Sequence, residues 1–125
     1  MTSDEEENDY YRDKLTELDD RVDGLREEFD GPYDHPRSDL ADRCLQECFG
    51  PIVSLYVESR TGGTFIHYDQ EEFDRIERVM NDSLEVYVGC YGHDHRPDCS
   101  IRPAGKLMME TRSARVTAEN LTKVP

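Results

Sequence analysis

The chain has 125 residues, enough for one compact domain with a short extension. Its 29 acidic and 15 basic residues give a net charge of −14, which repels nucleic acid and anionic membranes and excludes both as default partners. No apolar run approaches the ~18 residues that a membrane span requires, and the acidic N-terminus is unlike a secretory signal, so we expect a cytoplasmic protein.

Residues 1–31 predict an acidic amphipathic helix that extends from the rest of the chain. Residues 1–30 contain 13 acidic and four basic side chains. Apolar residues recur there every three or four positions, the spacing of a coiled-coil seam: Tyr11, Leu15, Leu18, Val22, Leu25 and Phe29. Gly31-Pro32 predicts the end of this helix, and residues 32–37 a linker. Two interpretations of the seam stay open: contact with a partner protein or second copy, or packing against its own domain.

Residues 38–125 predict a single α+β domain. A helix is expected over residues 38–49 and is ended by Gly50-Pro51. Strands are expected over 52–57 and 64–68, which are rich in β-branched and aromatic residues.

The second half of this domain predicts one more helix and three strands. Asp69 and Glu72 have the spacing of a helix capping box, and residues 81–83 are expected to end the helix that follows. Residues 84–90 alternate in the manner of a strand. Two further segments, 106–112 and 114–118, predict a hairpin.

The predicted element order is a long helix followed by α-β-β-α-β-β-β. Helices on one face of a mainly antiparallel sheet are the expected packing. This order resembles the roadblock and profilin type of small regulatory fold. The composition resembles that of proteins from halophilic archaea, because the chain has twelve Arg, only three Lys and no Trp beside its many carboxylates. That resemblance implies a habitat and identifies no functional family.

The stretch CYGHDHRPDC, residues 90–99, contains the residue types of a metal site. Zinc binds cysteine and histidine side chains, and Cys90, His93, His95 and Cys99 are close enough in sequence to surround one ion, although their spacing matches no standard zinc motif. Cys90 also continues the apolar side of the preceding segment, which favours a buried thiol. Zinc binding or thiol redox chemistry is therefore an alternative hypothesis, and otherwise no cofactor is expected.

The segment from residue 96 onward is basic, with six basic and three acidic residues. The candidates for an anion site are Arg96, Arg102, Lys106, Arg112 and Arg115. These charges could instead pair with acidic residues elsewhere in the chain. A nucleic acid is not the favoured ligand, because its binding weakens steeply with salt.

No nucleophile motif or phosphate-binding loop is present, and nothing in the sequence requires an enzyme. The leading hypothesis is a small non-enzymatic regulatory or adaptor module that acts through protein contacts and self-associates. An anion-binding or nucleic-acid-linked regulator that uses the basic segment is a second alternative.

Overall fold

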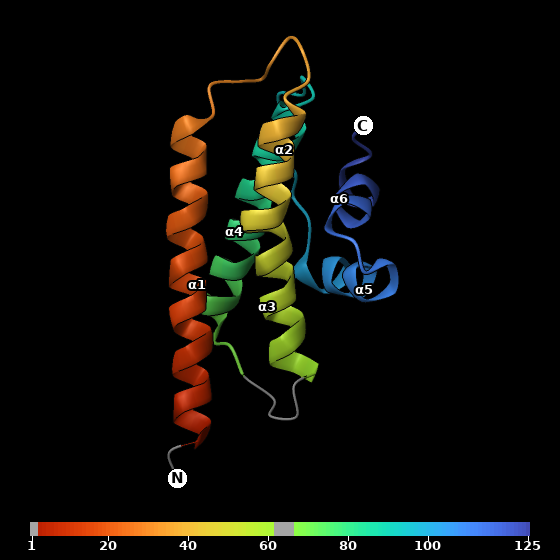
Figure 1. The fold of residues 1–125 in the computed structure, drawn as a ribbon. Coiled ribbons are helices and arrows are strands. Elements are labelled where there is room, and N and C mark those ends of the chain that lie inside the picture. Colours follow the sequence, from red (N-terminus) through yellow and green to blue (C-terminus); the bar gives the residue numbers. More distant parts are fainter. Residues whose placement is uncertain (1–2, 62–66) are drawn as a thin grey trace.

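The structure is a computed structural model that describes residues 3–61 and 67–125, with side chains from residue 9 onward in these ranges. All of its elements are helical (Figure 1). They are α1 (Ser3–Glu28), α2 (Ser38–Cys44), the π-helical segment η1 (Leu45–Phe49), α3 (Gly50–Thr61), α4 (Gln70–Gly89), α5 (Ile101–Thr111) and α6 (Ala114–Thr122). The predicted α+β class, with its antiparallel sheet and its likeness to roadblock and profilin folds, is therefore wrong, since the described residues contain no strand.

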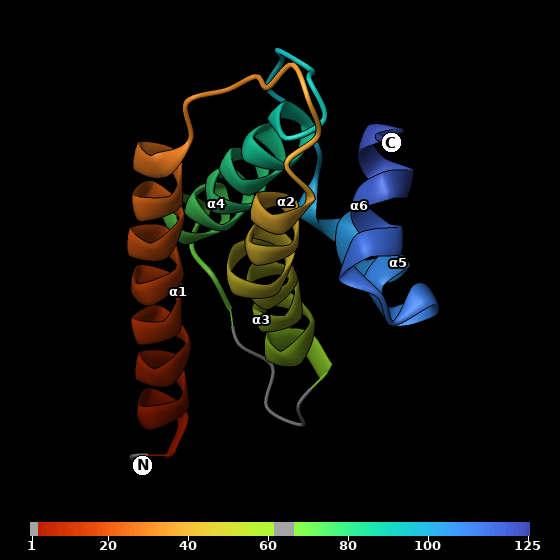
Figure 2. The same cartoon turned by 45° about the horizontal axis from the view of Figure 1, so that its top comes forward.

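The helices form an up-down-up bundle with a helical pair on one side. The segments α2, η1 and α3 follow one another without a break and run opposite to α1 and α4 (Figure 1). The pair α5 and α6 packs on α3 and η1, on the side away from α1 (Figure 2). The continuous helix over residues 38–61 is therefore the centre of the fold.

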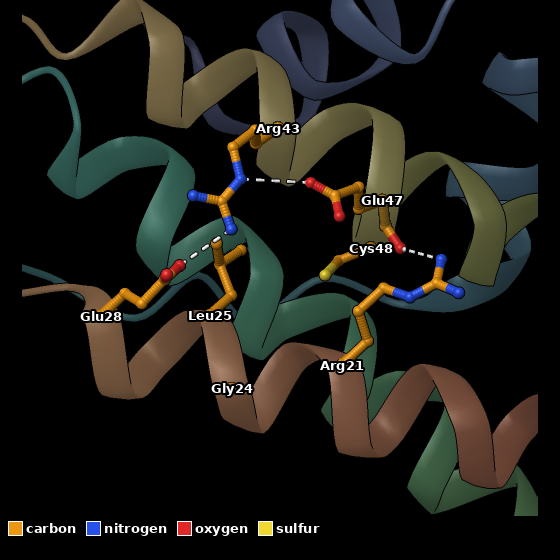
Figure 3. Close-up of a pocket in the computed structure, with 7 residues that line it drawn as sticks. All are labelled: Arg21, Gly24, Leu25, Glu28, Arg43, Glu47 and Cys48. Atoms are coloured by element: carbon orange, nitrogen blue, oxygen red, sulfur yellow. Dashed lines mark hydrogen bonds and ion pairs between the residues drawn. The ribbon is translucent and has the colours of Figure 1, made fainter.

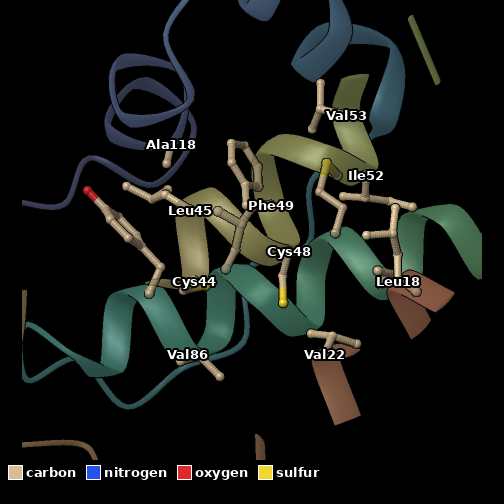
Figure 4. Close-up of a cluster of buried hydrophobic side chains, with 14 of the residues drawn as sticks. Leu18, Val22, Cys44, Leu45, Cys48, Phe49, Ile52, Val53, Val86 and Ala118 are labelled. Carbon is tan, nitrogen blue, oxygen red and sulfur yellow. The ribbon is translucent and has the colours of Figure 1, made fainter. Parts of the chain in front are cut away.

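One apolar core joins these helices (Figure 4). Its fully buried side chains include Leu15 of α1, Phe49 of η1 and Tyr87 of α4. The Tyr87 hydroxyl donates a hydrogen bond of 2.8 Å to the main-chain carbonyl of Val124, which ties the end of the chain to α4. The helix α1 thus shares its core with residues 38–125.

Residues 52–57, predicted as a strand, belong to α3. Ile52, Val53, Leu55 and Tyr56 are all buried, because α3 has neighbours on several sides. A helix that is buried on most of its surface lacks the polar face by which an amphipathic helix is recognised. A short β-branched run of this kind has the same pattern as a buried strand, and the packing around it decides between the two.

Residues 81–83 do not end α4, and residues 84–90 are not a strand, because α4 continues to Gly89. The polar side chains at 81–83 are buried inside the bundle. The Ser83 hydroxyl donates to the carbonyl of Met80 at 2.6 Å, a bond within the helix itself. Polar residues that usually interrupt a helix are tolerated when their side chains bond to carbonyls of the preceding turn.

The start of α4 confirms the predicted capping box. The main-chain N–H of Glu72 donates to the Asp69 carboxylate at 2.8 Å, and the N–H of Asp69 donates to the Glu72 carboxylate at 3.1 Å. The strand predicted just before it, over residues 64–68, falls partly outside the described residues. His67 and Tyr68 are described and form no strand.

The predicted hairpin over residues 106–112 and 114–118 is also wrong, because these segments belong to α5 and α6. Arg112 ends α5 in the left-handed conformation. The Ser113 hydroxyl then accepts a hydrogen bond of 3.1 Å from the N–H of Val116 and caps α6. A short polar break between two apolar segments suits a β-hairpin and a helical pair equally well, so the sequence pattern did not separate them.

The predicted helix over residues 38–49 is confirmed, but Gly50-Pro51 does not end it. Pro51 has no N–H for the carbonyl of Glu47, and its ring would clash with that carbonyl in an α-helix. The helix widens instead into a π-turn, in which the N–H of Gly50 donates to the carbonyl of Leu45 five residues earlier. A Cβ at position 50 would lie 2.8 Å from that carbonyl oxygen, so this turn requires glycine.

Candidate functional site

A groove between α3 and α5 combines positive charge with apolar surface. Its volume is about 340 Å³, within the range of ~300–1,000 Å³ typical of ligand sites. The lining residues are Tyr56, Val57, Arg60 and Thr61 of α3, and Arg102, Gly105, Lys106 and Met109 of α5. Within each set the residues lie at helical spacing, so each helix presents one side to the groove.

Gly105 and Tyr56 determine how closely α5 approaches α3. A Cβ at position 105 would lie 3.2 Å from Cδ2 of the Tyr56 ring, tighter than an ordinary contact, so glycine lets α5 lie against this ring. The Arg60 guanidinium lies over the same ring, 5.6 Å from its centroid, in a cation–π arrangement. Arg60 is absent from the anion-site prediction, although its spacing from Tyr56 would have indicated a shared face had residues 52–57 been interpreted as a helix.

Two of the positive charges in the groove, those of Arg102 and Lys106, are not neutralised within the described part of the chain. Arg102 and Lys106 are exposed and form no ion pair among the described residues. Ten other basic residues do form ion pairs: Arg12, Lys14, Arg21, Arg26, Arg37, Arg43, Arg75, Arg78, Arg96 and Arg115. The groove is therefore a local site of excess positive charge on a chain with a net charge of −14.

The structure brings together two of the five residues predicted to bind an anion, Arg102 and Lys106. Arg115 lies on α6 and pairs with Asp42 of α2. Arg112 is exposed at the end of α5 and does not line the groove. Of the five predicted residues, only Arg102 and Lys106 therefore lie at the groove.

Arg96, the fifth of these residues, belongs to an ion-pair network around the buried carboxylate of Asp82. Asp82 is only 2% exposed, and Arg96 pairs with its Oδ1. Arg26 of α1 and Arg78 of α4 lie 3.4 Å and 3.5 Å from its Oδ2. A carboxylate this deeply buried requires such partners, because an unpaired buried charge costs several kcal/mol, roughly 3–5. Arg96 therefore holds the segment after α4 in place.

The buried carboxylate of Asp19 forms a second set of ion pairs, between α1 and α4. Its Oδ2 accepts hydrogen bonds from Arg75 at 2.7 Å and from Arg78 at 2.8 Å. Burial acts to raise the pKa of Asp19, but the hydrogen bonds from the two guanidinium groups outweigh it and hold that pKa below its ordinary value. Ion pairs therefore hold α1 against α4 in addition to their apolar contacts.

Two polar side chains of α4 position the start of α5. The Asn81 side chain donates to the carbonyl of Cys99 and accepts from its N–H, each at 2.9 Å. The N–H of Ile101 donates to the Glu77 carboxylate at 2.8 Å. Since the first N–H groups of a helix have no partner within it, these bonds satisfy main-chain groups and fix where α5 begins.

The residues of the predicted zinc site lie at the end of α4 and in the segment after it. Cys90 is buried, which raises its pKa to about 11, and partial burial also raises the pKa of Cys99. His93 and His95 are exposed, with ring centroids 6.2 Å apart. Among the residues that the structure describes, no three His, Cys, Asp or Glu side chains are grouped as metal ligands. The fold therefore does not assemble these four residues into one ligand set.

The apolar seam of α1 faces the rest of the chain. Leu15, Leu18, Val22 and Leu25 are buried, and Tyr11 and Phe29 are partly buried against the same core. The helix α1 makes these contacts with α3, α4 and η1. A surface for a partner would therefore have to use other residues.

A second hollow, of about 270 Å³, lies between α1 and η1 (Figure 3). Arg21 donates a 2.9 Å hydrogen bond to the main-chain carbonyl of Glu47, the carbonyl for which Pro51 has no N–H. Arg43 pairs with Glu28 at 2.8 Å and also with the Glu47 side chain. Cys48 lies at the base of this hollow, where burial raises its pKa to about 11. Positive and negative groups balance here, so this hollow supports the π-turn and offers no excess charge to a ligand.

In the described residues, no helix combines the length and apolar character needed to cross a lipid bilayer. A family model described as "Domain of unknown function (DUF8055)" matches residues 9–125, so the chain belongs to this family. Comparisons with curated proteins and with solved structures gave no match. The groove between α3 and α5 combines the cations Arg102 and Lys106, unpaired among the described residues, with the exposed side chain of Met109.

Proposed function

We propose that this member of the DUF8055 family is a non-enzymatic regulatory or adaptor module that binds an acidic segment of a partner protein between α3 and α5. The observation that carries the proposal is the pair Arg102 and Lys106, which have no ionic partner in the described chain and line the same groove as Tyr56. Met109, at the same groove, is 54% exposed. Carboxylates would pair with the cations, and an apolar side chain would cover Met109 and Val57.

A short protein segment suits this groove better than a nucleic acid does. Duplex DNA carries one negative charge per ~1.7 Å, and the 29 acidic residues of the chain would repel it along its length. An acidic peptide brings a few charges to the point where Arg60, Arg102 and Lys106 gather. Salt screens the distant repulsion more strongly than the close contacts, which favours a compact ligand.

Fluorescence anisotropy with a labelled synthetic peptide of alternating Glu and Leu tests this proposal. The wild-type chain is expected to bind the peptide, and the double substitution Arg102→Glu with Lys106→Glu is expected to weaken binding at least ~10-fold. A second peptide with Ser in place of Leu is expected to bind more weakly, because it cannot cover the exposed Met109.

The double substitution Arg112→Glu with Lys123→Glu is a matched control. It changes the net charge by the same amount as the groove variant, but at two exposed positions outside the groove. This variant is expected to bind the peptide within ~2-fold of wild type once salt screens long-range charge. Far-UV circular dichroism establishes that both variants keep their helices. Equal loss of binding in both variants, or no binding by the wild-type chain at concentrations at which it is monomeric, would exclude the groove as the site.

A further inference from the structure

We infer that the groove between α3 and α5 binds the acidic N-terminal end of α1 from a second copy of this chain. This inference rests on the proposed function and names its partner. We call residues 3–10 the acidic arm. Residues 4–7 of the arm read Asp-Glu-Glu-Glu, and Asp9 and Tyr10 follow. The arm is therefore an acidic segment with an aromatic side chain. This matches the proposed ligand of the groove, an acidic protein segment that also carries an apolar side chain.

Exposed apolar surface points to the same pairing. The large exposed apolar side chains in the described part of the chain are Tyr10 at 51%, Met109 at 54% and Val116 at 39%. Tyr10 belongs to the arm and Met109 to the groove. Tyr10 lies in an acidic segment and Met109 lies in a basic groove. A contact between these two surfaces would pair opposite charges and bury both apolar side chains.

The arm is held away from the groove of its own chain. Tyr10 lines a hollow between α1 and α3 together with Leu55 and Glu58. On the α3 helix these two positions lie on the opposite side from Val57 and Arg60, which line the groove. Within one molecule, the arm and the groove therefore face different directions.

The continuity of α1 prevents the arm from folding back. The helix runs without interruption over 26 residues, about 39 Å. Figures 1 and 2 show it on the far side of α3 from α5, with its first residues extending past the end of α3. Only a second molecule can bring an arm to the groove. If two copies exchange arms about a twofold axis, both grooves are filled and the assembly closes as a dimer.

Charge reversal tests the pairing directly. An arm variant carries Glu5→Lys, Glu6→Lys and Glu7→Lys, and a groove variant carries Arg102→Glu and Lys106→Glu. The masses of the full chains are measured by analytical ultracentrifugation at about 0.1 M KCl, where charges act over ~10 Å. We expect wild type to have twice the monomer mass and each variant alone to be monomeric. The equimolar mixture of the two variants should recover the doubled mass, because each reversed arm then meets a reversed groove.

Each other result has a distinct meaning. A wild-type chain that binds the Glu-Leu peptide but stays monomeric would overturn this inference and leave the proposed function standing. A wild-type dimer that either variant retains, or that the mixture of variants does not restore, would place the dimer contact elsewhere and would also overturn it. A chain that neither binds the peptide nor dimerises would exclude both proposals. The variant with Arg112→Glu and Lys123→Glu is the control and is expected to dimerise like wild type.

Discussion

The carboxamide of Asn81 forms two hydrogen bonds with the main chain of Cys99, one through each of its polar atoms and each 2.9 Å long. These bonds join the middle of α4 to the segment that leads into α5. Because the groove exists only where α5 lies on α3, Asn81 contributes to the groove's geometry without lining it.

Replacing Asn81 by Ala is expected to destabilise the fold by about 2 kcal/mol, because two main-chain groups of Cys99 lose their partners. It should also weaken binding of the Glu-Leu peptide, since the start of α5 is less well fixed. The free energy of unfolding from urea denaturation measures the first effect, and anisotropy the second. The control is Asn120→Ala, whose exposed side chain donates to the carbonyl of Val116 one turn earlier. It should change stability by less than ~0.5 kcal/mol.

Two glycines within helices should respond in opposite ways to substitution by Ala. At position 50 a Cβ would lie 2.8 Å from the Leu45 carbonyl oxygen, so Gly50→Ala is expected to cost about 1–3 kcal/mol. At position 24 of α1 a Cβ would meet no atom of the described residues within 4 Å, so Gly24→Ala should stabilise the chain by up to ~1 kcal/mol. Denaturant unfolding compares the two variants. A stability gain in both would mean that the π-turn does not bring residues 45 and 50 together.

The ion pairs of Asp19 predict how stability changes in acid. Its pKa in the folded chain lies below that of the unfolded chain, which is about 3.9, because hydrogen bonds from Arg75 and Arg78 outweigh burial. The stabilisation is complete at pH values above the pKa of Asp19 in the unfolded chain. It is lost as the pH falls from that value through the lower pKa of Asp19 in the folded chain. Asp19→Asn should therefore lower stability at neutral pH and reduce the further loss below about pH 4.

Urea denaturation at a series of pH values measures this dependence. The control is Asp20→Asn, at an exposed neighbouring position that takes part in no ion pair of the described chain. It should follow the wild-type curve. An Asp19→Asn variant that loses stability in acid as steeply as wild type would show that the pairing contributes nothing to the pH dependence.

The burial of the four cysteines predicts how many of their thiols react with Ellman's reagent in the native chain. Cys44, Cys48 and Cys90 are buried, and burial raises the pKa of all three, to about 11 for the last two. At pH 8 a thiol with that pKa is on the order of 0.1% thiolate, the reactive form. In the native chain at most one thiol, that of the partly buried Cys99, should react with the reagent. In the Cys99→Ala variant no native thiol should react. All four thiols should react after denaturation. Fast reaction of a second native thiol would contradict this burial.

Several elements could be predicted because their signals lie within a few residues of each other. The apolar spacing from Tyr11 to Phe29 predicted the helix α1, and the spacing of Asp69 and Glu72 predicted where α4 begins. The excess of basic residues after residue 96 also predicted Arg102 as a candidate anion-binding residue. In each case, the physical cause is a local periodicity or a local hydrogen bond that the sequence displays directly.

Only the tertiary structure decided the fold class and which positive charges remain for a partner. Residues 52–57 are helical because they are surrounded by other helices, and their burial hides the periodicity that would identify them. Arg96 and Arg102 look alike in the sequence. Asp82 on α4 neutralises Arg96, whereas no acidic residue of the described chain pairs with Arg102. Ion pairing between residues far apart in sequence depends on how the helices pack, so the groove emerges only from the folded chain.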